Sequence, residues 1–266
     1  MSTEIITAVI AAVVALISAI VTITGQTRTA RLEHELTLQR DAQSKETKNN
    51  ELVAKYRNPI LKSAFDLQSR LFGIVQLGFL QIYYYKSPTD KEYATQHTLY
   101  VIAEYLGWIE IFRREVQFLD FGDLKTSQQL EKILSNISST FLTDGFDLTF
   151  RLFRGQQQAI GEIMTVKSEI NSGKHECMGF SDFVKRLDEP EFQRWFIKLS
   201  KDVEVLSNEP KGHERRLIIL QHLLIDLIDF LDPECIRIPQ SKRYKIESTR
   251  DVQQEIMQWY AKQNAV

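Results

Sequence analysis

Residues Ile5 to Thr24 form a twenty-residue run without a charged side chain, IITAVIAAVVALISAIVTIT, and this run constrains the fold more than any other feature. A helix rises about 1.5 Å per residue, so such a run covers about 30 Å, which matches the hydrocarbon core of a bilayer. A buried core helix is the alternative, but such helices usually keep a polar face. We therefore predict a single transmembrane helix within an anchor over residues 1–25.

The residues on either side of this run indicate its orientation in the membrane. The preceding residues contain Glu4 and no lysine or arginine, whereas Arg28, Arg31 and Arg40 follow the run. A cleaved signal peptide has a basic start and a shorter apolar core, so the run does not fit one. The bias of lysine and arginine toward the cytoplasmic side predicts a single-pass protein of the cell membrane. Its N-terminus is expected outside and the bulk of the chain in the cytoplasm.

Small side chains follow one face of the predicted span at three-or-four spacing. Small residues in register let two helices approach closely in lipid. We interpret this face as a homo-oligomerisation surface; chance in an alanine-rich span is the alternative. Its residues are Ala8, Ala11, Ala12, Ala15, Ser18, Ala19 and Thr22.

The rest of the chain is poor in residues that break helices. It has 11 glycines and 6 prolines, and no proline lies between Pro88 and Pro190. Long periodic segments with few breakers indicate an all-α protein. We expect a charged helical stalk over residues 26–57 and a cytoplasmic bundle of six to eight helices over residues 58–235. A tail over residues 236–266, basic and then amphipathic, completes the chain.

Apolar side chains at helical spacing mark the helices of the bundle. Asn58 suits an N-cap before Pro59, and Thr126 with Gln129 forms a capping box. The apolar segment from Leu61 to Tyr85 predicts a buried core helix, with a second span or an interfacial contact as the alternatives. The other apolar faces run from Leu99 to Leu119, from Leu130 to Phe141, from Phe192 to Val203, and from Leu217 to Leu231, the last in a central helix.

The stretch RLFRGQQQAIGE, Arg151 to Glu162, brings together two arginines, two glycines and a carboxylate. No Lys-Ser/Thr pair follows its glycines, so the phosphate-loop pattern fails, and the sequence contains no GxGxxG. We expect a helix that ends at Gly155 and a new helix after it, with Gly161 allowing close packing. The alternative is an anion held by Arg151 and Arg154 near the start of the new helix.

Histidine and carboxylate groups provide further candidates. His222, Asp226 and Asp229 share one side of the expected central helix. Such a set can serve in acid–base chemistry or hold a metal, but we favour the polar stripe of a mostly buried helix. His175 and Cys177 form an isolated pair without the further ligands that zinc requires. We therefore predict no metal site and no cofactor, and identify no catalytic residue.

Three stretches carry a family resemblance: YRNPILKSAFDLQSRLF, YLGWIEIFRREVQFLDFG and LFRGQQQAIGE. They resemble a family of uncharacterised bacterial proteins with one N-terminal membrane span and a helical cytoplasmic domain. The similarity covers about Lys55 to Met164 together with the anchor. It implies that one set of polar residues belongs together, as a binding site or as an internal ion-pair network. The set is Arg57, Arg70, Glu110, Arg113, Arg114, Arg151, Arg154 and Glu162.

Helical spacing and charge suggest partners within this set. Glu110 pairs naturally with Arg113 and Arg114 on one helix surface. Arg151 and Arg154 are expected to face partly buried carboxylates, with Glu110 or Glu162 as the leading candidates. Polar groups on otherwise apolar helices need partners when they are buried. A network of this kind would be structural rather than catalytic.

The sequence favours a non-enzymatic, membrane-tethered helical interaction or signalling module. Its expected partners are the membrane, further copies of the chain and a protein. The net charge of -2 gives no general attraction to nucleic acid, and Cys177 and Cys235 form no disulfide framework, as in a reducing compartment. Two alternatives remain: an oligomerising membrane effector, for example in cell defence, and an enzyme of unrecognised type.

Overall fold

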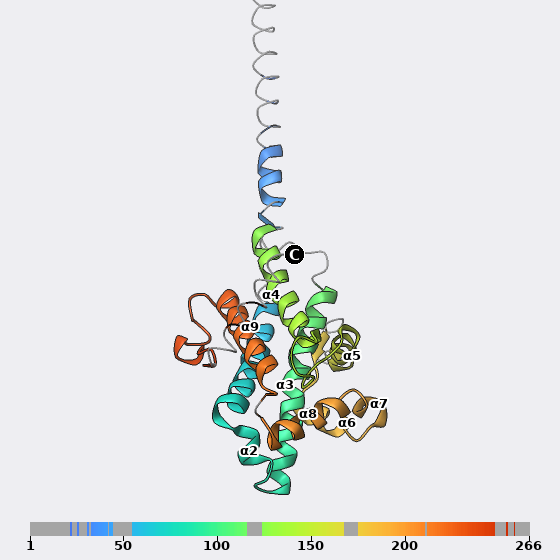
Figure 1. Cartoon of the computed structure of the whole chain (residues 1–266). Helices are drawn as coiled ribbons and strands as arrows, with labels where there is room; N and C mark the ends of the chain where they lie inside the picture. The colour runs from blue at the N-terminus through green and yellow to red at the C-terminus, as the bar shows by residue number, and fades with distance from the viewer. Residues whose placement is uncertain are drawn as a thin grey trace, which may run out of the picture. The chain divides into compact units, whose positions relative to one another are not determined.

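The computed structural model describes residues 22, 26, 31, 33–41, 43–44, 55–115, 124–167, 175–210, 212–247, 254 and 258. The chain divides into two compact units, Met1–Glu51 and Leu52–Val266. In the first unit, the described residues are helical and exposed. The second unit is a helical bundle (Figure 1).

The predicted membrane span lies almost entirely outside the described residues. Of residues 5–24, and of the small-residue face within them, only Thr22 is described; it is helical. Among the residues that the structure describes, no helix combines the length and the apolar character needed to cross a bilayer.

The described part of the second unit holds nine α-helices. One covers residues 55–77. The others are α2 (Phe79–Tyr83), α3 (Pro88–Glu115), α4 (Leu124–Leu142), α5 (Arg154–Met164), α6 (Phe180–Arg186), α7 (Pro190–Gln193), α8 (Ile197–Asn208) and α9 (Arg215–Leu231). The predicted all-α class is confirmed, but the expected six to eight helices are too few. The two shortest helices, α2 and α7, are too short to show a helical period in the sequence.

Two small elements of the described residues were not predicted from the sequence: a β-ribbon and the 3-10 helix η1 (Gln240–Lys242). Strands β1 (Thr165–Lys167) and β2 (His175–Cys177) pair antiparallel, with Thr165 opposite Cys177. Three residues are too few for a readable alternation of apolar and polar side chains. The ribbon follows α5 directly, and it also contacts α3.

Helix α9 is central, as the apolar segment from Leu217 to Leu231 predicts. Its aliphatic side chains are buried on almost every side, and it packs against α4, while α3 packs against α5. Helix 55–77 contributes buried residues such as Leu67 and Leu71 to the same core, so the predicted core helix is confirmed there. It ends sooner than expected, because Gly78 adopts a left-handed conformation (φ 63°) before α2 begins.

Two predicted helix starts are wrong. Residues 55–58 are already helical, so Asn58 is not an N-cap. Helix α4 begins at Leu124, which places Thr126 inside the helix rather than at its cap. Ser/Thr/Asn side chains suit caps locally, but packing of the apolar face decides where a helix starts. The segment from Phe192 to Val203 likewise divides into α7 and α8, with Pro190 in the first turn of α7.

Candidate functional site

Helices α3 and α5 cross closely because each has a glycine where it meets its neighbours. A Cβ on Gly161 would lie 2.7 Å from the Cβ of Glu110 and 2.8 Å from the carbonyl oxygen of Leu106. A Cβ on Gly107 would lie 2.7 Å from the Sγ of Cys177. These distances are shorter than real Cβ contacts, so a larger residue would push the elements apart. The predicted role of Gly161 in close packing is confirmed.

Glu110 is buried at this crossing, and two arginines of α3 bind its carboxylate. Arg113 donates from Nε to Oε2 (2.9 Å) and from Nη2 to Oε1 (2.8 Å), and Arg114 donates from Nε to Oε1 (2.5 Å). Burial pushes the pKa of Glu110 up, but the hydrogen bonds and charges of both arginines outweigh it and lower the pKa. The predicted pairing of Glu110 is confirmed.

Glu162 joins this group from α5. Its Oε1 lies 3.1 Å from Nη2 of Arg114, so Arg114 bridges the carboxylates of α3 and α5. Four of the eight grouped residues therefore meet: Glu110, Arg113, Arg114 and Glu162. We call these four residues the α3–α5 ion cluster.

A groove of about 320 Å³ opens beside the ion cluster, between α3, α4 and α5. Glu110 and Arg113 reach it from α3, and Arg154 and Gln157 reach it from α5. Apolar side chains form most of its wall: Tyr105, Leu106, Ile109, Leu134, Ile137 and Phe141. We call it the α3–α4–α5 groove. Its wall is apolar, and its charged groups are mainly guanidinium.

Gln157 fixes the geometry at the base of the groove. Its buried amide nitrogen donates to the carbonyl oxygens of Leu152 (2.9 Å) and Ser138 (3.1 Å), and its amide oxygen accepts from the Ser138 hydroxyl (2.8 Å). This side chain therefore ties α5 to α4. At the start of α5, Gln156 accepts the backbone N–H of Phe153 (2.9 Å), which satisfies one donor before the first helical turn.

Arg154 is the first residue of α5 and is exposed. Within the described part of the chain, its side chain has no hydrogen bond or ion pair. The prediction that it faces Glu110 or Glu162 as an ion-pair partner is therefore wrong. It shares the groove with Glu110, but Arg113 and Arg114 already occupy that carboxylate.

Arg151 lies apart from the groove. It pairs with the exposed carboxylate of Asp144, and its guanidinium lies 4.7 Å from the ring centre of Phe153. The predicted helix ending at Gly155 is also wrong: α4 ends at Leu142, residues 143–153 are not helical, and α5 starts before Gly155. Phe150 adopts a left-handed conformation (φ 57°) in this connection, which excludes a continuous helix.

Arg216 holds that connection in place, a role that was not predicted from the sequence. Its side chain is 0% exposed and donates to backbone carbonyls of the α4 end and the following segment. The distances are 3.0 Å to Thr149, 3.2 Å to Phe141, 2.9 Å to Thr143 and 2.7 Å to Asp147, with a further bond to Thr140. The available signal was its place at the start of the most apolar helix, where a buried arginine must find acceptors.

Arg57 and Arg70 have separate structural roles. Arg57 donates from Nε to the carbonyl oxygen of Leu231, at the end of α9. Arg70 lies 4.0 Å from the ring centre of Phe79 and donates to Nδ1 of His97 at 2.7 Å. With Arg151, these two arginines lie outside the α3–α5 ion cluster. The eight grouped residues therefore do not form one network.

The polar stripe of α9 is contacted by the chain's own residues 243–246. His222 donates from Nε2 to the carbonyl oxygen of Ile246 (3.0 Å), Lys245 pairs with Asp226 (2.6 Å) and Arg243 pairs with Asp229 (2.9 Å). These contacts explain the stripe as a docking surface for the segment after α9. Among the described residues, no group of three or more His, Cys, Asp and Glu side chains is placed to hold a metal ion.

His175 and Cys177 occupy β2, with structural partners. Nδ1 of His175 lies 3.2 Å from Oε1 of Glu115. The other oxygen of this carboxylate, Oε2, accepts a hydrogen bond from Tyr56 and pairs with Lys55 (3.1 Å). Burial raises the pKa of the Cys177 thiol, which packs against Gly107. These contacts fasten the ribbon to α3 and to the start of helix 55–77.

Comparison with known proteins gives no match: no family model, no curated protein and no solved structure is significantly similar to the chain.

Proposed function

We propose that this chain is a membrane-tethered, non-enzymatic interaction module. In this proposal, residues 5–24 cross the cell membrane once with the N-terminus outside, and the cytoplasmic bundle binds a protein partner in the α3–α4–α5 groove. The observation that carries the proposal is the composition of that groove, an apolar wall beside the guanidinium groups of Arg113 and Arg154.

The groove suits a segment that combines apolar and acidic side chains. An apolar side chain that enters it removes surface from water, which is the main source of affinity in such contacts. A carboxylate beside it can accept two parallel hydrogen bonds from Arg154, because a guanidinium presents its donors as a fork. Arg113 is held in place by Glu110, so one cation is fixed and the other is available.

The polar groups that suggested catalysis have partners that support a structural role. The Glu110 carboxylate binds Arg113 and Arg114, and His222 binds a backbone carbonyl in the segment after α9. An ion cluster whose central carboxylate, Glu110, is buried and paired supports the shape of a binding surface at the crossing of two helices.

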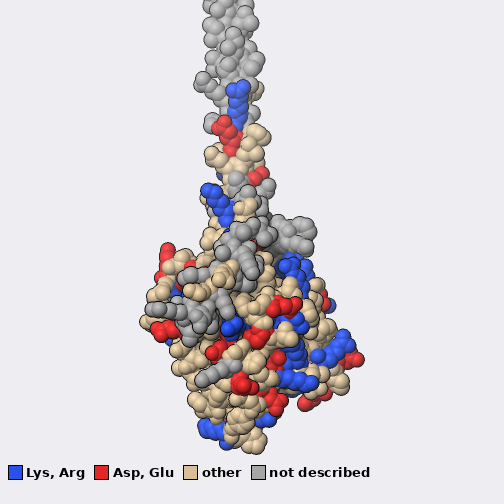
Figure 2. All heavy atoms as spheres, in the orientation of Figure 1, with Lys and Arg blue, Asp and Glu red and all other residues tan. Residues whose placement is uncertain are grey.

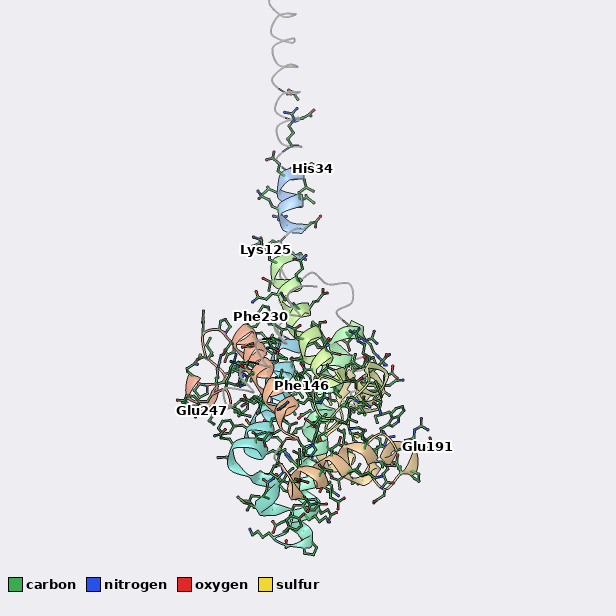
Figure 3. The ribbon with its side chains drawn as sticks, in the orientation of Figure 1. His34, Lys125, Phe146, Glu191, Phe230 and Glu247 are labelled. Atoms are coloured by element: carbon green, nitrogen blue, oxygen red, sulfur yellow. The ribbon has the colours of Figure 1, made fainter. Side chains whose placement is uncertain are left out.

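Charge reversal in the groove tests this proposal. A photo-crosslinking residue replaces Gln158, which lines the groove, in the full chain in native membranes. Arg154→Glu is compared with Lys125→Glu, since Lys125 is also exposed but lies at the start of α4 (Figure 3), more than two turns before the groove residues of that helix. We expect the crosslinked partner to be lost with Arg154→Glu and retained with Lys125→Glu.

A charge exchange makes this test specific. The crosslinked segment is identified by mass spectrometry, and its acidic residue is replaced by lysine. This change should restore crosslinking to Arg154→Glu. The proposal would be contradicted if crosslinking did not depend on the charge at position 154, or if the captured segment had no acidic residues.

The tether and its oligomerisation are tested separately. A C-terminal reporter that is active only outside the cytoplasm should give no signal, because the arginines after the span favour a cytoplasmic bundle. Replacing Ala11, Ala15 and Ala19 together by leucine should keep membrane insertion but weaken self-association, because leucine holds neighbouring helices apart. Equal signals from both chains in an in-membrane dimerisation assay would remove the small-residue face from the proposal.

A further inference from the structure

One end of the bundle presents large apolar side chains to solvent. Leu77 is 64% exposed, Ile82 55% and Tyr85 60%. They fall within residues 77–85, where helix 55–77 ends and α2 leads into α3, at the lower end of the bundle in Figure 1. With Lys86 and Lys91 they form what we call the α2 tip. Large exposed apolar groups that gather at one place usually mark an interaction site.

The α2 tip is held firmly, so its exposure is a property of the fold. Leu80 is completely buried and Tyr84 is nearly so, which points one side of α2 and the following turn into the core. The side chain of Gln81 donates to the carbonyl oxygen of Leu206 at 2.6 Å, which fastens α2 to α8. Ile82 is therefore on the outer side of a fixed helix.

The charges at the tip are cationic. The Lys86 ammonium lies 5.2 Å from the ring centre of Tyr83, and the Lys91 ammonium lies 4.4 Å from that of Tyr84. Neither lysine has a carboxylate partner in the part of the chain that the structure describes. The lower end of the visible face is mostly uncharged, with lysine or arginine at its edge and acidic side chains just above it (Figure 2).

The nearest carboxylates in the sequence are engaged within α3. Asp90 accepts a hydrogen bond from the Ser87 hydroxyl at 2.7 Å at the start of that helix. Glu92 accepts from the Gln96 amide at 3.0 Å, one turn along. Both carboxylates keep their charge, but among the described residues neither forms an ion pair with Lys86 or Lys91, so the two ammonium groups can contact an anionic surface.

We infer that the α2 tip inserts shallowly into the interface of an anionic lipid bilayer. Leu77 and Ile82 would enter the acyl boundary, Tyr85 would lie at the head-group level, and the two lysines would contact lipid phosphates. In segments that lie in a bilayer interface, aliphatic side chains enter the acyl boundary, whereas tyrosine and lysine side chains stay near the head groups.

This contact goes beyond the proposed tether, because it needs no transmembrane helix.

A fluorescent probe at the tip tests the inference in the full chain. Ile82→Cys is labelled with an environment-sensitive dye, in a chain that also carries Cys177→Ala and Cys235→Ala. The matched control is Ile197→Cys in the same background, since Ile197 is 48% exposed on α8. Both proteins are placed in nanodiscs of phosphatidylcholine, with or without phosphatidylglycerol, and with nitroxide groups on the lipid acyl chains.

We expect blue-shifted emission and nitroxide quenching at position 82 in the phosphatidylglycerol discs, and neither at position 197. Adding Lys86→Glu and Lys91→Glu should abolish the quenching at position 82. Equal behaviour at the two positions would overturn the inference. So would a blue shift that appears without lipid as protein concentration rises, since that result would assign the tip to a second copy of the chain.

Separate experiments test the proposed transmembrane tether and the proposed contact of the α2 tip with lipid. Extraction of the chain by alkaline carbonate would reject the transmembrane span. The probe can still be read after the chain is added to vesicles of the same lipids, because the tip acts from the bundle surface.

Discussion

Arg243 and Asp232 form a buried ion pair, with Nη2 of the arginine 2.6 Å from Oδ2 of the aspartate. Their side chains are only 1% and 3% exposed. Asp232 also accepts the backbone N–H groups of Ile236, Arg237 and Ile238, so the carboxylate shapes the turn after α9. Burial raises the pKa of Asp232, but these N–H groups and Arg243 outweigh it and lower the pKa.

Arg243→Met should therefore destabilise the fold strongly. Removing one partner of a buried ion pair leaves the other charge uncompensated, at a cost of about 3–5 kcal/mol. Urea denaturation of the purified chain measures the change. Lys242→Met is the matched control, because Lys242 is adjacent and exposed, and its substitution should change stability by less than about 0.5 kcal/mol. Similar losses from both variants would contradict the buried pair.

The second prediction concerns Arg216, and it separates the effect of the side chain's shape on stability from the effect of its charge. Arg216→Met leaves several buried carbonyl oxygens without donors and should cost at least about 3 kcal/mol. Arg216→Lys keeps the charge but cannot reach carbonyls on both sides, so it should recover only part of the loss. Arg154→Lys should be neutral, since Arg154 is exposed. Full recovery by lysine in denaturation experiments would show that charge alone is sufficient.

The two buried arginines also show where sequence reasoning reaches its limit. The segment after α9 looks like a basic tail because Lys242, Arg243 and Lys245 are close together in sequence. The structure instead buries Arg243 and places Lys245 beside Asp226. Neighbouring basic residues look alike in a sequence, and only the tertiary position of an acceptor distinguishes them.

Predictions from the sequence were correct where the two interacting residues lie close together on the same helix. The pairing of Glu110 with Arg113 and Arg114 follows from helical spacing alone. The central position of α9 follows from its apolar sequence. Arg216, by contrast, binds carbonyls 67 to 76 positions away. The prediction for the segment before Arg154 was also wrong, because this segment is held by the distant Arg216 and Asp202 as well as by local hydrogen bonds.

Because of the α3–α5 ion cluster, we expect the stability of the fold to depend on pH. The pKa of Glu110 is below its ordinary value of 4.5 in the folded chain. Its contribution is therefore complete above the unfolded pKa and is lost as pH falls through the lowered folded value. Glu110→Gln should cost about 1.5–3 kcal/mol at neutral pH, as expected of hydrogen bonds to a charged group. In urea denaturation at a series of pH values, this difference should shrink below pH 4.5.

Glu162→Gln is the control for this pH series. Glu162 is an exposed member of the same cluster, and an exposed ion pair contributes less than about 1 kcal/mol. Its removal should change stability less than removal of Glu110 at every pH. A Glu110→Gln effect that stays constant into acid would show that packing, rather than ionisation, accounts for it.

The two glycines of α5 give the last prediction, in which one type of substitution has opposite effects. At Gly155 an added Cβ meets nothing within 4 Å, so Gly155→Ala should stabilise the helix by about 0.5–1 kcal/mol. At Gly161 the same Cβ would lie 2.8 Å from the backbone oxygen of Leu106, which a side-chain rotation cannot relieve. Gly161→Ala should therefore cost about 1–3 kcal/mol through overpacking. Thermal and urea denaturation measure both changes. Stabilisation by both alanines would mean that α3 and α5 do not cross in close contact, and that the wall of the groove between them is arranged differently.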